Sequence, residues 1–275
     1  MMKPDVAGSD RLSGGNGLKS TVALSWRLFR HTVGAKYRKS FLGYFWMVAP
    51  AIFITLGVTL ANRAGILSAG DTALPFPLFV LLGTLLWQVC AEAVDIAHRA
   101  FDGARSYLTR VYFSRSAIIL VQFYEALLIM AVRCLLVVLL LFFFNGLELQ
   151  GLLLVVLSFF GAVTLGLGVG ALLMPFTMLF ADLHNALKLV LSYGLFLTPA
   201  LYQPTGDSVF ATILRFNPVS PLMLAAREGA ANLPLSQPVV LTGVLIAAAL
   251  TTIAGFAMAR LVAPIVIERM LLGGK

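Results

Sequence analysis

The most constraining feature of this sequence is a stretch of 33 residues, Leu149 to Ala181, that contains no charged side chain. An α-helix rises about 1.5 Å per residue, so this stretch is more than long enough to cross the hydrocarbon core of a bilayer, which is roughly 30 Å thick. A mean hydropathy of +0.93 and a charged fraction of only 12% extend this conclusion to the rest of the chain. The sequence therefore predicts a polytopic membrane protein.

Five further apolar stretches predict an all-α membrane protein with six transmembrane helices. The six predicted spans are residues 44–61, 72–91, 116–145, 149–181, 189–206 and 239–262. The fourth contains glycines that favour close helix packing, at positions Gly161, Gly166, Gly168 and Gly170. Prolines divide residues 203–238 into apolar pieces too short to cross, which predicts short re-entrant helices on the outer side.

The N-terminal part of the chain precedes the first predicted span. Residues 1–19 are rich in Gly and Ser and lack an apolar core, which predicts a disordered cytoplasmic tail and argues against a signal peptide. Residues 20–40 predict an amphipathic interface helix on the inner leaflet, although the same stripe also suits packing against a protein partner. The apolar residues of the stripe are Val22, Trp26, Phe29 and Val33. Residues 41–275 form the predicted six-span domain.

Positive charge is distributed unequally along the chain. On the six-span topology, sixteen of the twenty Lys and Arg residues lie on the inner side, and eight of them precede residue 40. Only Arg63, Arg215 and Arg227 fall outside, and Arg133 lies within a span. The positive-inside rule therefore predicts a membrane protein with both termini in the cytoplasm. The net charge of +8 is explained by this topology and does not indicate nucleic-acid binding.

Four ionisable residues fall within or at the inner ends of the second and third spans. They are Glu92, Asp95, Glu125 and Arg133. Charged groups at this depth normally face the bundle interior and pair with one another. The pattern favours a structural ion pair between the two spans, and a proton relay is the alternative.

Aromatic residues in the first and fifth predicted spans are candidates for the lining of a transport path. Tyr193, Phe196 and Tyr202 follow one face of the fifth span, and Phe53 lies in the first. Aromatic rings stack on the apolar faces of sugars, so a glycan channel would use such side chains. More often, aromatic residues in such positions form an interfacial belt or pack between helices.

Sequence motifs for catalysis are absent. The chain contains no GxxxxGK[ST] phosphate loop and no HExxH or CxxC metal pattern, so we expect neither an enzyme nor a bound cofactor or metal. Cys90 and Cys134 both lie in apolar runs, where cysteines are usually small buried hydrophobes.

Short motifs occur in order at the ends of the predicted spans. A YRxSxLGxxW segment with a following proline comprises Tyr37, Arg38, Ser40, Leu42, Gly43, Trp46 and Pro50. A PxFxxxGxxxW pattern comprises Pro77, Phe79, Gly83 and Trp87. TPxxY and NPxxP elements comprise Thr198, Pro199, Tyr202, Asn217, Pro218 and Pro221, and Arg227 follows them.

The order of these motifs resembles the transmembrane subunit of type-2 ABC exporters, specifically the permeases that export lipid-linked polysaccharide. The resemblance covers nearly the whole chain after Ser20. It departs from the family pattern at Ser114, which replaces the usual proline of a KxxFPR-like element at residues 110–115, and at Ala181, which replaces the arginine of an RD pair. The loop conformation and the ion pair of the family are therefore not carried over.

The resemblance implies a protein of the bacterial cytoplasmic (inner) membrane that forms a homodimer. Two copies of a separate ATPase subunit would bind this homodimer and hold ATP and Mg²⁺. The substrate would be a lipid-linked glycan that passes between the protomers, beside the first and fifth spans. Tyr37, Arg38 and Lys39 would form the mouth of this path, with Tyr37 and Arg38 gripping the lipid-phosphate headgroup.

The central cytoplasmic segment, residues 98–113, would dock on the ATPase as a coupling helix. The residues expected to make this contact are Arg99, Phe101, Asp102, Arg105, Arg110 and Tyr112. A solvated basic turn beside anionic lipid is the alternative interpretation of this segment.

Other functions remain open at the level of sequence. Within the same family, the substrate could be teichoic acid, a small lipid or a drug instead of an O-antigen or a capsule-like glycan. An ion-coupled secondary transporter that uses Arg133 with Glu92 is a further alternative, although no internal repeat supports it. A membrane protein with a purely structural role is the last alternative, and it predicts that no ATPase copurifies.

Overall fold

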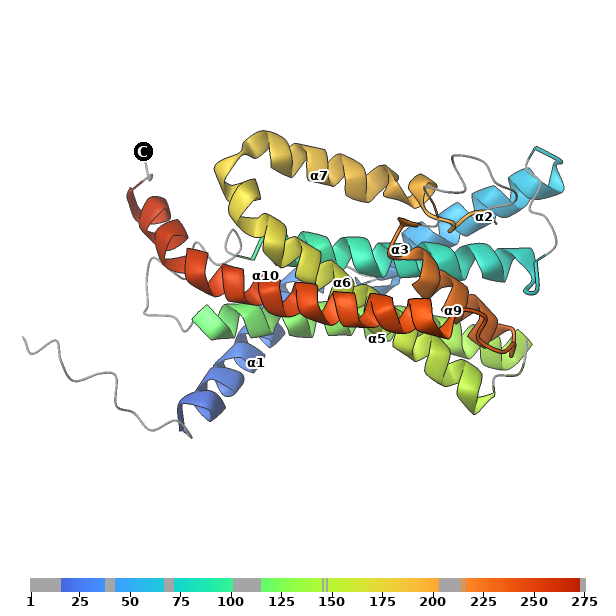
Figure 1. The fold of residues 1–275 in the computed structure, drawn as a ribbon, viewed down its shortest axis with the longest axis horizontal. Helices are drawn as coiled ribbons and strands as arrows, with labels where there is room; N and C mark the ends of the chain where they lie inside the picture. The colour runs from blue at the N-terminus through green and yellow to red at the C-terminus, as the bar shows by residue number, and fades with distance from the viewer. Residues whose placement is uncertain are drawn as a thin grey trace, which may run out of the picture.

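The computed structural model describes residues 16–37, 43–66, 72–100, 115–144, 146, 148–202, 214 and 216–272. Within these residues the fold is entirely helical. Figure 1 shows an elongated bundle in which the long helices run roughly along one axis. The predicted all-α class is therefore confirmed.

Among the described residues, four helices are long and apolar enough to cross a membrane. They are α3 (Phe76–His98), α5 (Arg115–Phe144), α6 (Leu149–Leu179) and α10 (Pro238–Leu272). They coincide with the second, third, fourth and sixth predicted spans, and they fit a multi-pass membrane protein. The helix α10 continues for ten residues beyond the predicted end of the sixth span at Val262.

The first and fifth predicted spans do not form single spanning helices. Residues 44–61 divide into a 3₁₀ turn, η1 (Gly43–Met47), and the 15-residue helix α2 (Ala49–Arg63). The break precedes Pro50, which has no N–H group with which to continue an incoming helix.

The fifth predicted span, residues 189–206, is interrupted in the same way. The helix α7 covers Ala181–Tyr193, is followed by a 3₁₀ turn, η2 (Gly194–Leu197), and gives way to turns over residues 198–202. The polar residues between the fourth and fifth predicted spans, Asp182, His184 and Lys188, therefore lie on a helix. The break falls at Gly194 and Pro199, residues that weaken or end helices.

The central helix of the bundle is α6, which contacts α3, α5, α7, α9 and α10. Its glycines allow these close contacts. Gly166 and Gly170 lie against backbone carbonyls of α3, and a Cβ atom at Gly168 would lie 2.6 Å from the backbone nitrogen of Thr252 on α10. Glycine at these positions therefore lets the backbones approach one another directly.

The N-terminal helix α1 spans Asn16–Tyr37 and begins four residues before the predicted start. Its apolar stripe contacts α5, where Trp26 and Phe29 lie beside the ring of Tyr124 at centroid distances of 5.7 and 5.8 Å. Phe29 and Val33 are buried. The stripe thus packs, at least in part, on the chain's own third span.

The segment between α7 and α10 contains one described helix, α9 (Ser220–Ala230), which contacts α6. At 11 residues it is too short to cross a membrane, as predicted for residues 203–238. Most of the first half of that range lies outside the described residues. The two cysteines are free and buried.

Candidate functional site

A polar stripe interrupts the apolar surface of α3. It comprises Gln88, Glu92, Asp95 and Arg99, which recur at intervals of three and four residues and so share one helix face. None of the four is fully buried, and the Glu92 side chain is 43% exposed although it lies in a candidate membrane span. Polar groups in such a span usually mark a transport path or a binding site.

Arg133 anchors this stripe to two other segments. Its side chain is 1% exposed, and Nη2 donates to Glu92 Oε1 at 2.5 Å. Nε and Nη2 also donate to the carbonyl oxygen of Met47, at 3.0 and 2.8 Å. The structure therefore brings Glu92 and Arg133 together. It adds the backbone of η1 as a third member of the cluster.

Asp95, another of the predicted intramembrane carboxylates, belongs to a separate ion pair. Asp95 pairs with Arg99 one turn further along α3. Glu125 lies partly buried on α5. Glu92 and Asp95 therefore belong to two separate ion pairs, with Arg133 and with Arg99.

Two histidines meet at the C-terminal end of α3. His98 Nε2 lies 3.3 Å from His184 Nδ1 of α7, and His98 Nδ1 lies 3.1 Å from the carbonyl oxygen of Val94. His98 is buried. Since the Val94 carbonyl oxygen can only accept a hydrogen bond, Nδ1 of His98 carries the hydrogen. In a neutral His98 ring, Nε2 then accepts a hydrogen bond from Nδ1–H of His184, which links α3 to α7. Sequence reasoning missed this pair, because the two residues are 86 positions apart and no motif contains them.

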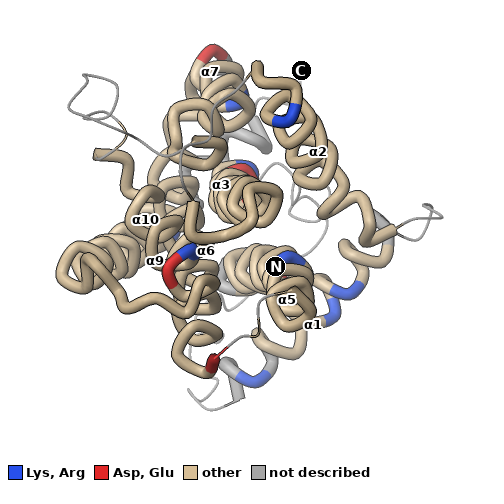
Figure 2. Tube along the Cα trace, turned by 90° about the vertical axis from the view of Figure 1, so that its right-hand side faces the viewer, with Lys and Arg blue, Asp and Glu red and all other residues tan. Residues whose placement is uncertain are grey.

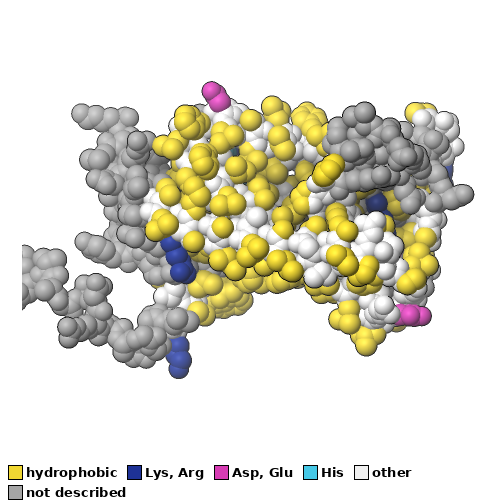
Figure 3. All heavy atoms as spheres, viewed as in Figure 1, with side chains coloured by type: hydrophobic (Ala, Val, Ile, Leu, Met, Phe, Trp, Pro, Cys, Tyr) yellow, Lys and Arg dark blue, Asp and Glu magenta, His cyan; other side chains and the backbone are white. Residues whose placement is uncertain are grey.

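Three of the predicted channel-lining residues lie on an exposed apolar surface. Phe53 of α2 is 65% exposed, and Tyr193 and Phe196 of α7 and η2 are also exposed. Both α2 and α7 contact α3, and Figures 1 and 2 place them on the side of α3 away from α5. Figure 3 shows apolar side chains over most of the visible bundle. We call the surface of α2, α7 and η2 the α2–α7 face.

Tyr202 has a different role from the other aromatic residues. Its hydroxyl donates to the carbonyl oxygen of Phe196 at 2.7 Å, and so closes the turn that follows η2. The side chain is partly buried. Its observed contact is thus with the chain's own backbone.

Motifs that are distant in the sequence converge at the other end of α3, around Arg227 of α9. Its guanidinium donates to the carbonyl oxygens of Pro199, Ala200 and Phe79, at 2.7, 2.8 and 3.3 Å. It also lies over the Phe79 ring, 3.4 Å from the centroid, in a cation–π contact. Gly83 faces the same guanidinium, because a Cβ atom there would lie 2.6 Å from Nη2.

Two further contacts extend this cluster. We call the whole cluster the Arg227 junction, and it comprises Phe79, Gly83, Trp87, Gly194, Pro199, Ala200, Asn217 and Arg227. Trp87 Nε1 donates to the carbonyl oxygen of Leu191 at 3.2 Å, and a Cβ atom at Gly194 would clash with the Trp87 ring. Asn217 Nδ2 donates to the carbonyl oxygen of Leu197 at 3.1 Å. The PxFxxxGxxxW, TPxxY and NPxxP motifs therefore meet in one place.

Several predicted site residues lie outside the described residues. They are Arg38 and Lys39 of the predicted mouth and Phe101, Asp102, Arg105, Arg110 and Tyr112 of the predicted coupling helix. For Tyr37 the structure gives only its place as the last residue of α1. Of the coupling residues, Arg99 alone is described.

Within the described ranges, no group of three or more His, Cys, Asp or Glu residues could hold a metal ion. Neither a search of protein-family models nor a search of curated proteins finds a match for the chain.

Proposed function

We propose that this chain is the channel-forming transmembrane subunit of an ATP-driven exporter. It moves a lipid-linked polysaccharide, O-antigen-like or capsule-like, from the cytoplasmic to the outer side of the inner membrane. Two copies of the chain form the path, and two copies of a separate ATPase subunit supply the energy. The proposal rests on the motif order that resembles type-2 ABC permeases.

The observation that carries the proposal is the α2–α7 face beside the polar stripe. Both α2 and α7 are too short to cross a bilayer alone, and they leave aromatic side chains uncovered on the same side of α3. A partly exposed carboxylate such as Glu92 is costly in hydrocarbon. The polar stripe therefore argues against a surface that faces lipid. A second copy of the chain packed over this face would enclose the stripe in a path between protomers.

The chemistry of that path suits a glycan. Hydroxyl groups of a sugar can exchange hydrogen bonds with Gln88, Glu92 and Asp95, while its apolar faces stack on Tyr193 or Phe196. The inner end of the stripe, at Arg99, leads directly to the predicted coupling segment. Motion of the ATPase would in this way reach α3 at the point where substrate contacts it.

The export function predicts a specific cellular defect. In cells that lack this chain, lipid-linked polysaccharide is expected to accumulate on the cytoplasmic side of the membrane, and expression of the chain should clear it. Labelling of the glycan in intact and in permeabilised cells measures the two pools. A normal distribution of glycan in the deletion strain would exclude this substrate and leave a small lipid, a drug or teichoic acid.

The ion pair of Arg133 and Glu92 favours one other candidate, an ion-coupled secondary transporter, because such pairs serve as proton relays. Inside-out membrane vesicles separate the two mechanisms. With the ATPase present, an uncoupler should leave ATP-driven transport unchanged, and removal of ATP should stop it. Loss of transport on uncoupling while ATP remains would favour the secondary transporter.

Chemical crosslinking tests the proposed dimer. A Phe53→Cys variant should give a crosslinked dimer with a flexible bismaleimide in native membranes, because α2 would border the second protomer. The matched control is Ile253→Cys, because Ile253 is 67% exposed against 65% for Phe53. It belongs to α10, a helix that lies on the opposite side of the bundle from α2 (Figure 2). The native cysteines are buried and should add little background. Equal crosslinking of the two variants would contradict this dimer.

A further inference from the structure

A cavity of about 540 Å³ opens beside the Arg227 junction. Its walls come from α9, from residues 72–74 just before α3, and from the first turn of α10. Two candidate membrane spans begin here, at Phe76 and Pro238, so the cavity lies where a bilayer meets water. The volume is in the range of about 300–1,000 Å³ that is typical of small-molecule sites.

The cavity carries one positive and one negative side chain. Arg227 has no carboxylate partner among the described residues, since its hydrogen bonds go only to backbone carbonyls. Glu228 accepts hydrogen bonds from the N–H and hydroxyl groups of Ser236 and has no cationic partner in the same residues. Their orientations are thus fixed by hydrogen bonds, but neither charge is neutralised.

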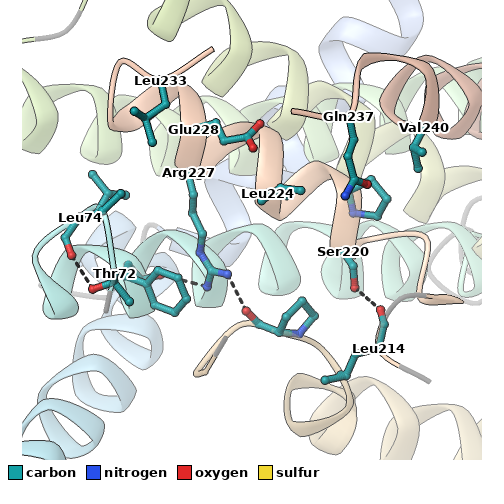
Figure 4. A pocket seen from close by; sticks show the side chains of 14 residues that line it. Thr72, Leu74, Leu214, Ser220, Leu224, Arg227, Glu228, Leu233, Gln237 and Val240 are labelled. Atoms are coloured by element: carbon teal, nitrogen blue, oxygen red, sulfur yellow. Dashed lines mark hydrogen bonds between the residues drawn. The ribbon is translucent and has the colours of Figure 1, made fainter. Parts of the chain in front are cut away.

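The two charges lie apart within the cavity. Figure 4 shows the Arg227 guanidinium and the Glu228 carboxylate pointing in different directions from α9, as consecutive helical residues do. The hydroxyls of Thr72 and Ser220 donate to the carbonyl oxygens of Leu74 and Leu214, so they offer only acceptors to a ligand. A bound molecule therefore meets a cation at one point and several acceptors at others.

The remaining walls are apolar, apart from the Gln237 side chain. They comprise the side chains of Leu74, Pro199, Leu214, Pro221, Leu224, Leu233 and Val240. A free sugar or a free phosphate would leave this surface uncovered, whereas a hydrocarbon chain would cover it. The combination of separated charges and apolar walls at the bilayer boundary is complementary to a lipid with a zwitterionic headgroup.

We propose that this cavity binds one phospholipid whose headgroup carries both a phosphate and a primary ammonium. The phosphate lies toward Arg227, where the low dielectric of the cavity lets the guanidinium attract it without giving up its carbonyl partners. The ammonium lies toward Glu228 and donates to the free acceptors of Ser220 or Thr72. The start of an acyl chain covers Leu233 and Val240. Binding requires neither ATP nor the exported glycan, so its failure would leave the proposed export function untouched.

The test uses the full chain purified in detergent, with equimolar phosphatidylethanolamine and phosphatidylglycerol of the same acyl length. Native mass spectrometry counts the lipids retained per chain. We expect one retained phosphatidylethanolamine, preferred about tenfold over phosphatidylglycerol, because the anionic lipid places no cation near Glu228. Retention of phosphatidylglycerol at the same or a higher level would overturn the proposal.

Two variants locate the site. Glu228→Gln keeps the side chain's shape and should reduce the tenfold preference to near parity. Val240→Trp should fill the cavity and abolish retention. Its matched control is Val239→Trp, because the preceding residue is 83% exposed and does not line the cavity. If both tryptophan variants elute as folded protein and retain the lipid equally, the lipid binds elsewhere and the proposal is wrong.

Discussion

Replacement of Glu92 by Leu is expected to reduce the free energy of unfolding by about 3 kcal/mol. Arg133 would remain buried and charged, with only the Met47 carbonyl oxygen as a partner. Removal of one partner of a buried ion pair typically costs about 3–5 kcal/mol, and the lower end applies because Glu92 is 43% exposed. Titration of the purified protein with a denaturing detergent, followed by tryptophan fluorescence, measures the change.

A double variant tests whether the loss comes from the pair. Glu92→Leu with Arg133→Met should recover most of the lost stability, since replacement of both partners by apolar residues is often neutral. A remaining deficit of about 1–2 kcal/mol is expected, because the Met47 carbonyl then lacks a donor. Losses that simply add in the double variant would show that the two residues are not coupled.

A control on the same helix separates this effect from the general cost of changing a carboxylate. Asp95 lies one turn beyond Glu92 and pairs with Arg99, whose side chain is 47% exposed. Asp95→Leu should therefore cost less than about 1 kcal/mol, as is usual for ion pairs at an exposed surface. A loss as large as that of Glu92→Leu would contradict the assigned role of the buried pair.

The four long spans and the Glu92–Arg133 pair could be anticipated from the sequence for simple physical reasons. Uncharged length decides whether a helix can cross a bilayer, and residues 149–179 provide that length without interruption. An arginine within a span, such as Arg133, needs a partner, and few carboxylates lie at the same depth in the predicted membrane. Both inferences depend only on the length of uncharged runs and on the positions of ionisable residues, which can be read from a single sequence.

The broken spans could not be anticipated, because their stability depends on distant donors. A break in a membrane helix frees backbone carbonyls that must find hydrogen bonds within the protein. At η1 the donor to Met47 is Arg133, 86 residues away. Hydropathy measures the length of an apolar run and contains no information about such partners.

The fifth span follows the same rule with more donors. The carbonyl oxygens of residues 196, 197, 199 and 200 accept from Tyr202, Asn217 and Arg227. These donors belong to the motifs that the sequence displayed as separate short patterns. All of these donors form hydrogen bonds with the carbonyl oxygens of one unwound segment. This shared role can be recognised only in the folded chain.

Replacement of Gly83 by Val is expected to cost at least about 3 kcal/mol, and folded protein should be nearly absent from the membrane. Even a Cβ atom at this position would lie 2.6 Å from Arg227 Nη2 and 2.7 Å from the Ala200 carbonyl oxygen. Overpacking usually costs about 1–3 kcal/mol, and the upper end applies here because backbone atoms block the new side chain. Size-exclusion chromatography of the detergent-solubilised protein measures the folded fraction.

Two further variants decide whether the close approach is the cause. Gly243→Val on α10 makes the same change where nothing lies within 4 Å of the new Cβ atom, so its stability should remain within about 0.5 kcal/mol of the wild type. Ala200→Gly should not rescue Gly83→Val, because the blocking atoms of Ala200 are its carbonyl oxygen and Cα, which glycine retains. Rescue by Ala200→Gly, or equal losses for Gly83→Val and Gly243→Val, would show that the Arg227 junction does not require glycine at position 83.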